Sequence, residues 1–384
     1  MTSSWRPQAP ALTRSEQGPT GSTSTGQPLA TGSDHDPRPA ARTVRDYSVL
    51  AKIVRQSGLL RRRYGYYWTR LLLTLAAFCG VWAGVVLLGE SWWQLVLAAA
   101  LALVLSQLAF LGHDSAHRQV FRSRAWNDWT ARILANALVG LSHTWWTTKH
   151  DAHHTAPNQE GQDPDISPGV IAFTPAVMAT RRGWRGWLAR RQGWFFIPLL
   201  TLEGLHLHVR SVQTVLGRRP VPRRWIEAPV LLTRLVLYVA VLFVLLPPAL
   251  AGAFAAVQLA VFGVLLGGAF APNHKGMPIV PATADVDFLR RQVLMSRNIR
   301  GGVVVDFLMG GLNRQVEHHL FPGMPRPNLK HVQPLVREYC AQLGVTYTEV
   351  GFFVSYRIVI NYLNDVPGRA RDPFTCPLAA SLGR

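Results

Sequence analysis

The sequence predicts an all-α integral membrane protein with four transmembrane helices in two hairpins and a cytosolic helical cap. Three observations support this fold class. Four almost uncharged apolar stretches occur in two closely spaced pairs, the lysines and arginines gather outside them, and eight histidines occur in segments beside them. The length of 384 residues and the 48% hydrophobic content would also fit two soluble domains, so the distribution decides the class.

Residues 1–42 are rich in Ser, Thr, Gly and Pro and show no apolar periodicity, so we expect a disordered N-terminal tail. We expect the membrane domain to cover residues 43–360 and a C-terminal tail to cover residues 361–384.

The first predicted hairpin covers residues 71–89 and 92–112. The stretch "LLLTLAAFCGVWAGVVLLG" carries no charge, and as a helix it would span about 28 Å, close to the hydrocarbon thickness of a bilayer. The second stretch, "WWQLVLAAALALVLSQLAFLG", follows after the short turn "GESW". Two helices joined by so short a turn must run antiparallel.

The second predicted hairpin covers residues 228–246 and 251–270, separated by "PPALAG". Arg234, near the start of its first helix, is the exception in an otherwise apolar pattern. A further apolar stretch at 194–209 is expected to lie in, or dip into, the membrane interface. It contains His206 and His208, for which a role near the metal ligands or in a substrate pocket stays open.

The positions of the positive charges predict the orientation. The two short turns lack Lys and Arg, whereas "RRRYGYYWTR", "RRGWRGWLARR" and "GRRPVPRR" flank the other ends of the spans. Because positive residues stay on the cytoplasmic side, we expect a multi-pass protein of the cell membrane with both termini and the central segment in the cytoplasm.

The net charge of +19 indicates contact with anionic membrane lipids. It does not indicate nucleic-acid binding, because the basic clusters flank membrane spans and contain Trp and Tyr. The three cysteines, Cys79, Cys340 and Cys376, are far apart and predict neither disulfides nor a thiolate metal site.

Eight histidines fall in four segments that the predicted topology places on one side of the membrane. Histidines three or four residues apart share one helical face, so they can bind the same ion. The candidate ligands are His113 and His117 in "HDSAH", His150, His153 and His154 in "HDAHH", His274 in "APNHKGMP", and His318 and His319 in "QVEHH". His35, His143 and His331 are expected to be ordinary polar residues.

Eight imidazoles exceed the needs of one tetrahedral zinc, so we expect two metal ions with about four imidazoles each. Imidazole suits zinc, copper, iron and nickel, which leaves the metal open at this point. Acidic side chains near the ligands are candidates to accept the second ring N–H of each imidazole. They are Asp114, Asp151, Glu317 and Asp306.

The three histidine motifs closely resemble, in order and spacing, the histidine boxes of the membrane fatty acid desaturases. The Gln that opens "QVEHH" is most similar to the front-end branch and to related bacterial acyl-lipid or acyl-CoA enzymes. The segments "GHDSAHRQVFRS", "HHTAPNQEGQDPDI", "PNHKGMP" and "NRQVEHHLFPGMPRPNL" extend the resemblance over about residues 45–350.

The resemblance implies a non-haem di-iron enzyme that uses O2 to introduce a cis double bond into a fatty acyl chain. By the same resemblance, the seven histidines of the boxes and His274 would be the iron ligands. Gln315 occupies a position at which other branches of the desaturases have His. By the resemblance, Gln315 is either an iron ligand or a neighbour of the ligands. The acyl group could arrive on coenzyme A, a carrier protein or a phospholipid.

A fused haem domain would carry an H-P-G-G motif, which these 384 residues lack, as they lack a cysteine pattern for an iron–sulfur cluster. We therefore expect electrons from a separate carrier, such as a ferredoxin with its reductase.

Two alternative functions stay open. Hydroxylation or ketolation of an acyl or carotenoid-like chain would use the same scaffold and the same three boxes. A membrane metal transporter is a more distant alternative, because transporter sites lie within the spans, whereas these histidines lie beyond them.

Overall fold

The structure, a computed structural model, describes residues 38–371, with side chains from 45 to 368, and the compact unit begins at Ala40. The described chain is almost entirely helical, and its strands are two three-residue segments, β1 (Asn298–Arg300) and β2 (Glu349–Gly351), which pair in parallel. The predicted all-α class is therefore confirmed. The predicted tails fall largely on residues 1–37 and 372–384, which lie outside the described range.

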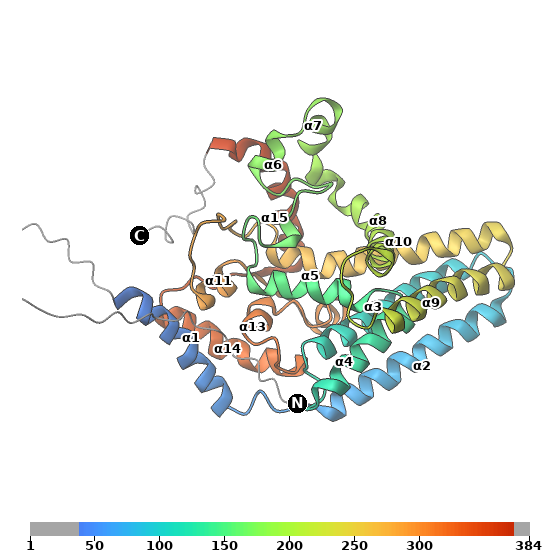
Figure 1. The fold of residues 1–384 in the computed structure, drawn as a ribbon, viewed down its shortest axis with the longest axis horizontal. Coiled ribbons are helices and arrows are strands. Elements are labelled where there is room, and N and C mark those ends of the chain that lie inside the picture. Colours follow the sequence, from blue (N-terminus) through green and yellow to red (C-terminus); the bar gives the residue numbers. More distant parts are fainter. Residues whose placement is uncertain (1–37, 372–384) are drawn as a thin grey trace, which may run out of the picture. The chain divides into compact units, whose positions relative to one another are not determined.

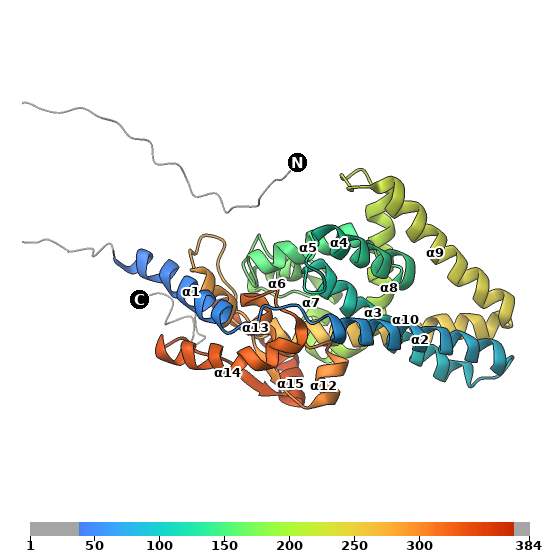
Figure 2. The ribbon, with the colours of Figure 1, turned by 90° about the horizontal axis from the view of Figure 1, so that it is seen from below.

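Between residues 38 and 371, four helices are long and apolar enough to cross a membrane, as predicted. They form two hairpins; α2, α3 and α10 run side by side, whereas α9 diverges from them toward its N-terminal end (Figures 1 and 2). The observed ends differ from the predicted ones by at most four residues, except that α2 begins seven residues earlier than predicted. The helices are α2 (Tyr64–Leu88), α3 (Gln94–Ala116), α9 (Arg224–Leu245) and α10 (Pro248–His274).

The turn of the first hairpin is closed by specific hydrogen bonds. Gly89 has a φ of 60°, a left-handed value that favours glycine. The Gln94 side-chain amide donates to the carbonyl oxygens of Val85 at 2.8 Å and Gly89 at 2.9 Å. These bonds satisfy carbonyl groups that the end of α2 would otherwise leave without a partner.

The inner and outer helices of the hairpins differ in burial. Within their most apolar windows, 56% of residues are buried in α3 and 39% in α10, but only 6% in α2 and 11% in α9. Large apolar side chains on the outer helices, such as Leu72, Leu87 and Val244, are exposed. An exposed apolar surface of this extent suits a lipid environment, and α3 and α10 form the inner core.

Short helices between the hairpins and after them form the cap (Figure 1). The π-helix η1 continues directly from α4, and α8 crosses α10 at Gly204 and Gly263, where an added Cβ would clash with backbone. The segments between the hairpins are α4 (Arg124–Arg132), η1 (Ile133–Val139), α5 (His143–Thr155), η2 (Pro164–Ile166), α6 (Pro175–Ala179), α7 (Gly183–Ala189) and α8 (Gln192–Leu216).

Helices α1, α11, α13 and α14 build a second apolar core, whereas α15 and η3 pack with α8 in a third one. Leu50 of α1 shares the second core with Val293, Val316 and Val332 from three later helices. The remaining helices are α1 (Arg38–Gln56), α11 (Phe288–Leu294), α12 (Val303–Leu308), α13 (Gln315–Leu320), α14 (Arg326–Gln342), α15 (Phe352–Asp365) and η3 (Val366–Arg371). Helix α15 continues across residue 360, where the sequence predicted the domain to end.

Candidate metal centre

The structure brings all eight candidate histidines together. They come from the C-terminal ends of α3 and α10, from α5 and from α13, so the two inner membrane helices bring candidate ligands to the same end. His113 lies in the last turn of α3, and His274 is the last residue of α10. The site is therefore built on helical extensions of the predicted spans.

The first cluster consists of His113, His117, His150 and His318. One ring nitrogen from each lies within 4.8 Å of the others. The Nε2 atoms of His117 and His150 are 2.8 Å apart, and the His113 Nε2 atom is buried without a hydrogen-bond partner.

The second cluster consists of His153, His274 and His319. Their ring nitrogens also lie within 4.8 Å of one another, and the Nε2 atoms of His153 and His274 are 3.3 Å apart. The Gln315 side chain reaches the same place, with its amide nitrogen 3.0 Å from His274 Nε2. Gln315 thus contacts a ring of this cluster, as the resemblance allowed.

His154 lies between the two clusters. Its Nε2 atom is 3.0 Å from that of His150 and 3.2 Å from that of His318, and its ring stacks on His319 at 4.2 Å. The histidines thus form two adjacent groups with one ring between them, each of which could hold a metal ion.

The hydrogen bonds of the second cluster test whether its rings fit a metal. Each ring places Nδ1 against an acceptor: the Asp163 carboxylate for His153 at 3.0 Å, the Met295 carbonyl for His274 at 2.9 Å, and the Gln292 carbonyl oxygen for His319 at 2.8 Å. A neutral imidazole carries one N–H, so these bonds leave the Nε2 lone pairs of three rings, whose ligand atoms lie within 4.8 Å of one another, as acceptors. Such a donor set fits a metal ion.

Burial also prepares the rings for metal binding. Burial, reinforced by the neighbouring histidines, lowers the pKa of His117, His150, His154, His318 and His319 well below its ordinary value. The rings are therefore neutral near pH 7, which is the form that binds a metal.

The predicted acidic partners divide into one that reaches a ligand and three that do not. Asp114 lies 3.3 Å from His113 Nδ1 and pairs with Arg326 at 2.7 Å. Glu317 instead accepts hydrogen bonds from Tyr347 and Asn298, Asp306 pairs with Arg314, and Asp151 is exposed on α5. Their carboxylates make no hydrogen bond to a histidine ring among the described residues.

Sequence reasoning missed Asp163, Asp165 and Gln292. Asp163 accepts from His153 and from the backbone N–H of Asn158, and it caps the short helix η2. Burial raises the pKa of the Asp163 carboxyl, but the hydrogen bond from His153 lowers it overall. The two acidic residues in "QDPDI" could have suggested a partner for a histidine ring, but their spacing from His153 does not place them on one helical face with it.

Replacing Asp163 by Asn is expected to lower metal affinity or turnover about 10- to 100-fold, because partners of ligating histidines commonly contribute that much. Asp151→Asn is the matched control, since Asp151 lies in the same motif as His153 but is exposed. Metal content after dialysis against a chelator measures both. Equal loss in the two variants would contradict the role of Asp163.

A buried carboxylate fixes the start of α5, the helix that carries three of the eight candidate ligands. Glu227, in the first turn of α9, accepts from Ser142 Oγ at 2.5 Å, from Thr144 N at 3.0 Å and from Thr144 Oγ1 at 2.7 Å. Arg132 of α4 also forms an ion pair with Glu227, with its Nη1 atom 3.0 Å from the carboxylate. Anions are favoured at helix N-termini, so Glu227 links the second hairpin to α5.

Glu227→Ala is expected to destabilise the protein by about 3–5 kcal/mol, because it leaves the partly buried Arg132 charge unpaired. Glu227→Gln keeps an acceptor for Ser142 and is expected to lose less. Thermal unfolding in detergent measures the difference, and an unchanged midpoint for Glu227→Ala would contradict the assignment.

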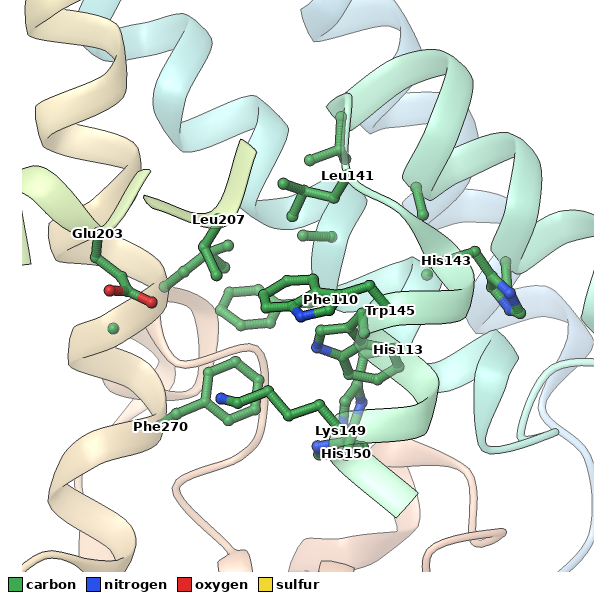
Figure 3. Close-up of a pocket in the computed structure, with 18 of the residues that line it drawn as sticks. Phe110, His113, Leu141, His143, Trp145, Lys149, His150, Glu203, Leu207 and Phe270 are labelled. Atoms are coloured by element: carbon green, nitrogen blue, oxygen red, sulfur yellow. The ribbon is translucent and has the colours of Figure 1, made fainter. Parts of the chain in front are cut away.

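An apolar cavity opens against the first cluster (Figure 3). It encloses about 150 Å³, and its walls come from α3, η1, α5, α8 and α10. Phe110, Leu207 and Phe270 line it together with His113 and His150. A chain of methylene groups in this cavity would lie against the candidate metal ligands.

Charged groups line the same cavity. Lys149 pairs with Asp165, and Glu203 also faces the cavity. Burial opposes a charge on Lys149, but Asp165 raises its pKa above the ordinary value, so the pair stays ionised. The cavity is thus apolar over most of its wall, with a polar part at which the headgroup of a ligand would fit.

The sequence was also compared with known proteins. The family model described as "Fatty acid desaturase" matches residues 90–351. The chain is 31% identical to an acyl-lipid (9-3)-desaturase of Physcomitrium patens, over 87% of this chain and 65% of that protein. It is 27% identical to a Delta(8)-fatty-acid desaturase of Helianthus annuus, over 85% of this chain and 74% of that protein.

A further relative is the Delta(6)-fatty-acid desaturase fat-3 of Caenorhabditis elegans, at 26% identity over 85% of this chain and 75% of that protein. The match to the moss protein covers slightly less than two thirds of that protein's length. The family model and the similarity to the moss protein together confirm the resemblance: this chain belongs to the fatty acid desaturase family.

Proposed function

We propose that this protein is an oxygen-dependent fatty acid desaturase, an oxidoreductase that introduces a cis double bond into a fatty acyl chain. One observation carries the proposal: two adjacent histidine clusters lie beside an apolar cavity, and His113 and His150 of the first cluster form part of its wall. The family membership and the names of the relatives support the same reaction class.

The metal is proposed to be iron, with one ion held by the first cluster and one by the second. His154 and Gln315 would complete the donor set. Bound iron would supply the redox chemistry by which O2 takes up hydrogens from two neighbouring methylenes. Each turnover breaks two C–H bonds, forms one C=C bond and reduces O2 to two water molecules, with two electrons and two protons from outside.

The protein itself positions the acyl chain. A methylene chain offers no hydrogen-bonding group, so the apolar wall must fix which carbon pair lies against His113 and His150. Phe110 and Phe270 narrow the cavity beside these rings (Figure 3). The ion pair of Lys149 and Asp165 would hold the polar end of the substrate, whether that end is a coenzyme A, carrier-protein or phospholipid headgroup.

The membrane orientation follows from the same arrangement. We propose that the four helices cross the cell membrane, with both termini and the metal centre in the cytoplasm. The arginine-rich segments beside the spans support this orientation. Electrons would then come from a cytoplasmic carrier protein, for which a ferredoxin with its reductase is the candidate.

The test is expression in a host that lacks polyunsaturated lipids, together with a ferredoxin and its reductase. Gas chromatography of the fatty acids, with derivatives that locate double bonds, is expected to show a new unsaturated species. The His153→Ala/His154→Ala double variant should make none. A hydroxylated or keto product would show that the protein is a hydroxylase or ketolase instead. Absence of any product would contradict the proposal that the substrate is a fatty acyl chain.

A further inference from the structure

One edge of the metal centre reaches the protein surface. Six of the eight histidines are buried, whereas His117 and His154 keep part of their surface exposed. Their ring centroids are 4.6 Å apart, so the two partly exposed histidines are direct neighbours. Electron transfer through protein weakens steeply with distance, so an electron from outside enters most easily at such an edge.

Three arginines lie beside the segments that carry His117 and His154 and are called the arginine rim: Arg62, Arg118 and Arg291. Arg118 directly follows His117 and is exposed. Arg62 Nη1 donates to the Gly323 carbonyl at 3.0 Å and lies 3.4 Å from that of Gln119. Arg291 Nη1 donates to the carbonyl of Thr155, the residue after His154, at 3.3 Å.

The backbone at Arg118 indicates that its side chain has a role. Its φ is 58°, and the N–H groups of Arg118 and Gln119 donate to the carbonyls of Ser115 and Asp114. This is the helix-ending motif in which glycine is favoured at the left-handed position. A non-glycine residue there costs about 1–2 kcal/mol, and a residue kept at that cost points to a function of its side chain.

The charges of the rim are available to a partner. Among the side chains described, from 45 to 368, none of the three guanidinium groups lies within ion-pair distance of a carboxylate. Asp151 on α5 is not within ion-pair distance of them, although its charge interacts with that of Arg118. Three positive charges without an ion pair, next to two partly exposed histidines, suit an acidic protein.

We propose that the arginine rim is the docking surface for an acidic one-electron carrier protein, which delivers its electrons at the edges of His117 and His154. The inference rests on the proposed function, because each desaturation consumes two electrons and the protein needs a place to receive them. The carrier is oxidised by one electron in each encounter, so two encounters complete one turnover.

Docking by the rim predicts a selective kinetic defect. The test variant is Arg118→Gly/Arg291→Gln, in which glycine also relieves the left-handed strain and so favours folding. The control variant, Arg218→Gln/Arg219→Gln, removes the same charge from the exposed loop between α8 and α9. The probe is a small acidic [2Fe–2S] ferredoxin reduced by NADPH and its reductase.

The KM for reduced ferredoxin is expected to rise about tenfold or more in the test variant, to lose most of its salt dependence, and to stay unchanged in the control. A single turnover driven by dithionite, which needs no docking, should give the same product yield in all three proteins. Iron content should also be equal.

Either of two results would overturn the proposal. One is an unchanged KM for ferredoxin in the test variant; if that variant also loses binding to phosphatidylglycerol vesicles, the rim is a lipid contact. The other is a product loss with dithionite equal to the loss with ferredoxin. An unmutated protein that yields no double bond even with dithionite would instead overturn the proposed function, whatever the rim binds.

Discussion

His153→Ala is expected to abolish formation of the double bond and to reduce bound iron from about two ions per chain to about one or fewer. His153 contributes its Nε2 atom to the second cluster and donates Nδ1–H to Asp163. Substitution of a residue that only hydrogen-bonds to a ligand typically lowers metal affinity or activity about 10- to 100-fold. Loss of a ligand itself should lower them further. Elemental analysis and product assay measure the two effects.

His331→Ala is the control for this variant. His331 is exposed on α14 and lies in neither cluster, as the sequence predicted for an ordinary polar histidine. It should keep both iron and activity. Full iron and full turnover in His153→Ala would show that the second cluster is not a metal site.

Ala135→Leu is expected to shift the products toward shorter acyl chains. Ala135 lines the cavity beside the first cluster, so the added carbons take space that a substrate would occupy. A difference of one methylene in an apolar pocket changes kcat/KM about 10- to 200-fold, and a similar loss is expected here for the longest substrates. Competition between acyl chains of graded length measures the selectivity.

The same π-helix supplies the control. Ala137 lies two residues further along η1 and lines a different cavity, beside Phe78 and Trp82. Ala137→Leu should therefore leave chain-length selectivity unchanged, although either variant can lose about 1–3 kcal/mol of stability from overpacking. The same shift in both variants would mean that the cavity beside the histidines does not hold the acyl chain.

The sequence predicted the elements that depend on local pattern. Four apolar stretches of membrane length appear as four long helices, and histidines spaced by three or four residues appear on helical faces. His274 was also placed correctly beside the boxes, because hairpin topology returns the end of α10 to the level of the end of α3. Helix ends were less accurate, since α2 begins at Tyr64 rather than at residue 71. Hydropathy reports the lipid-facing part of a helix, whereas backbone hydrogen bonding continues beyond it.

Contacts between distant segments could not be predicted in this way. Glu317 is next to two ligands in sequence, yet its carboxylate points to Tyr347, while Gln292, distant from every box, holds His319. The π-helix η1 leaves no mark in a pattern of alanines and aliphatic residues, although it directs Ala135 and Ala137 to different cavities. These features depend on how helices pack, which composition and spacing do not encode.

The most direct test of the central claim is the mass of the product formed by purified, iron-loaded protein from a saturated acyl substrate under ¹⁸O2. A desaturase whose iron is bound by the two histidine clusters should yield a product that has lost two hydrogens and contains no ¹⁸O. A product that has gained a labelled oxygen would contradict desaturation and assign the same metal centre to hydroxylation.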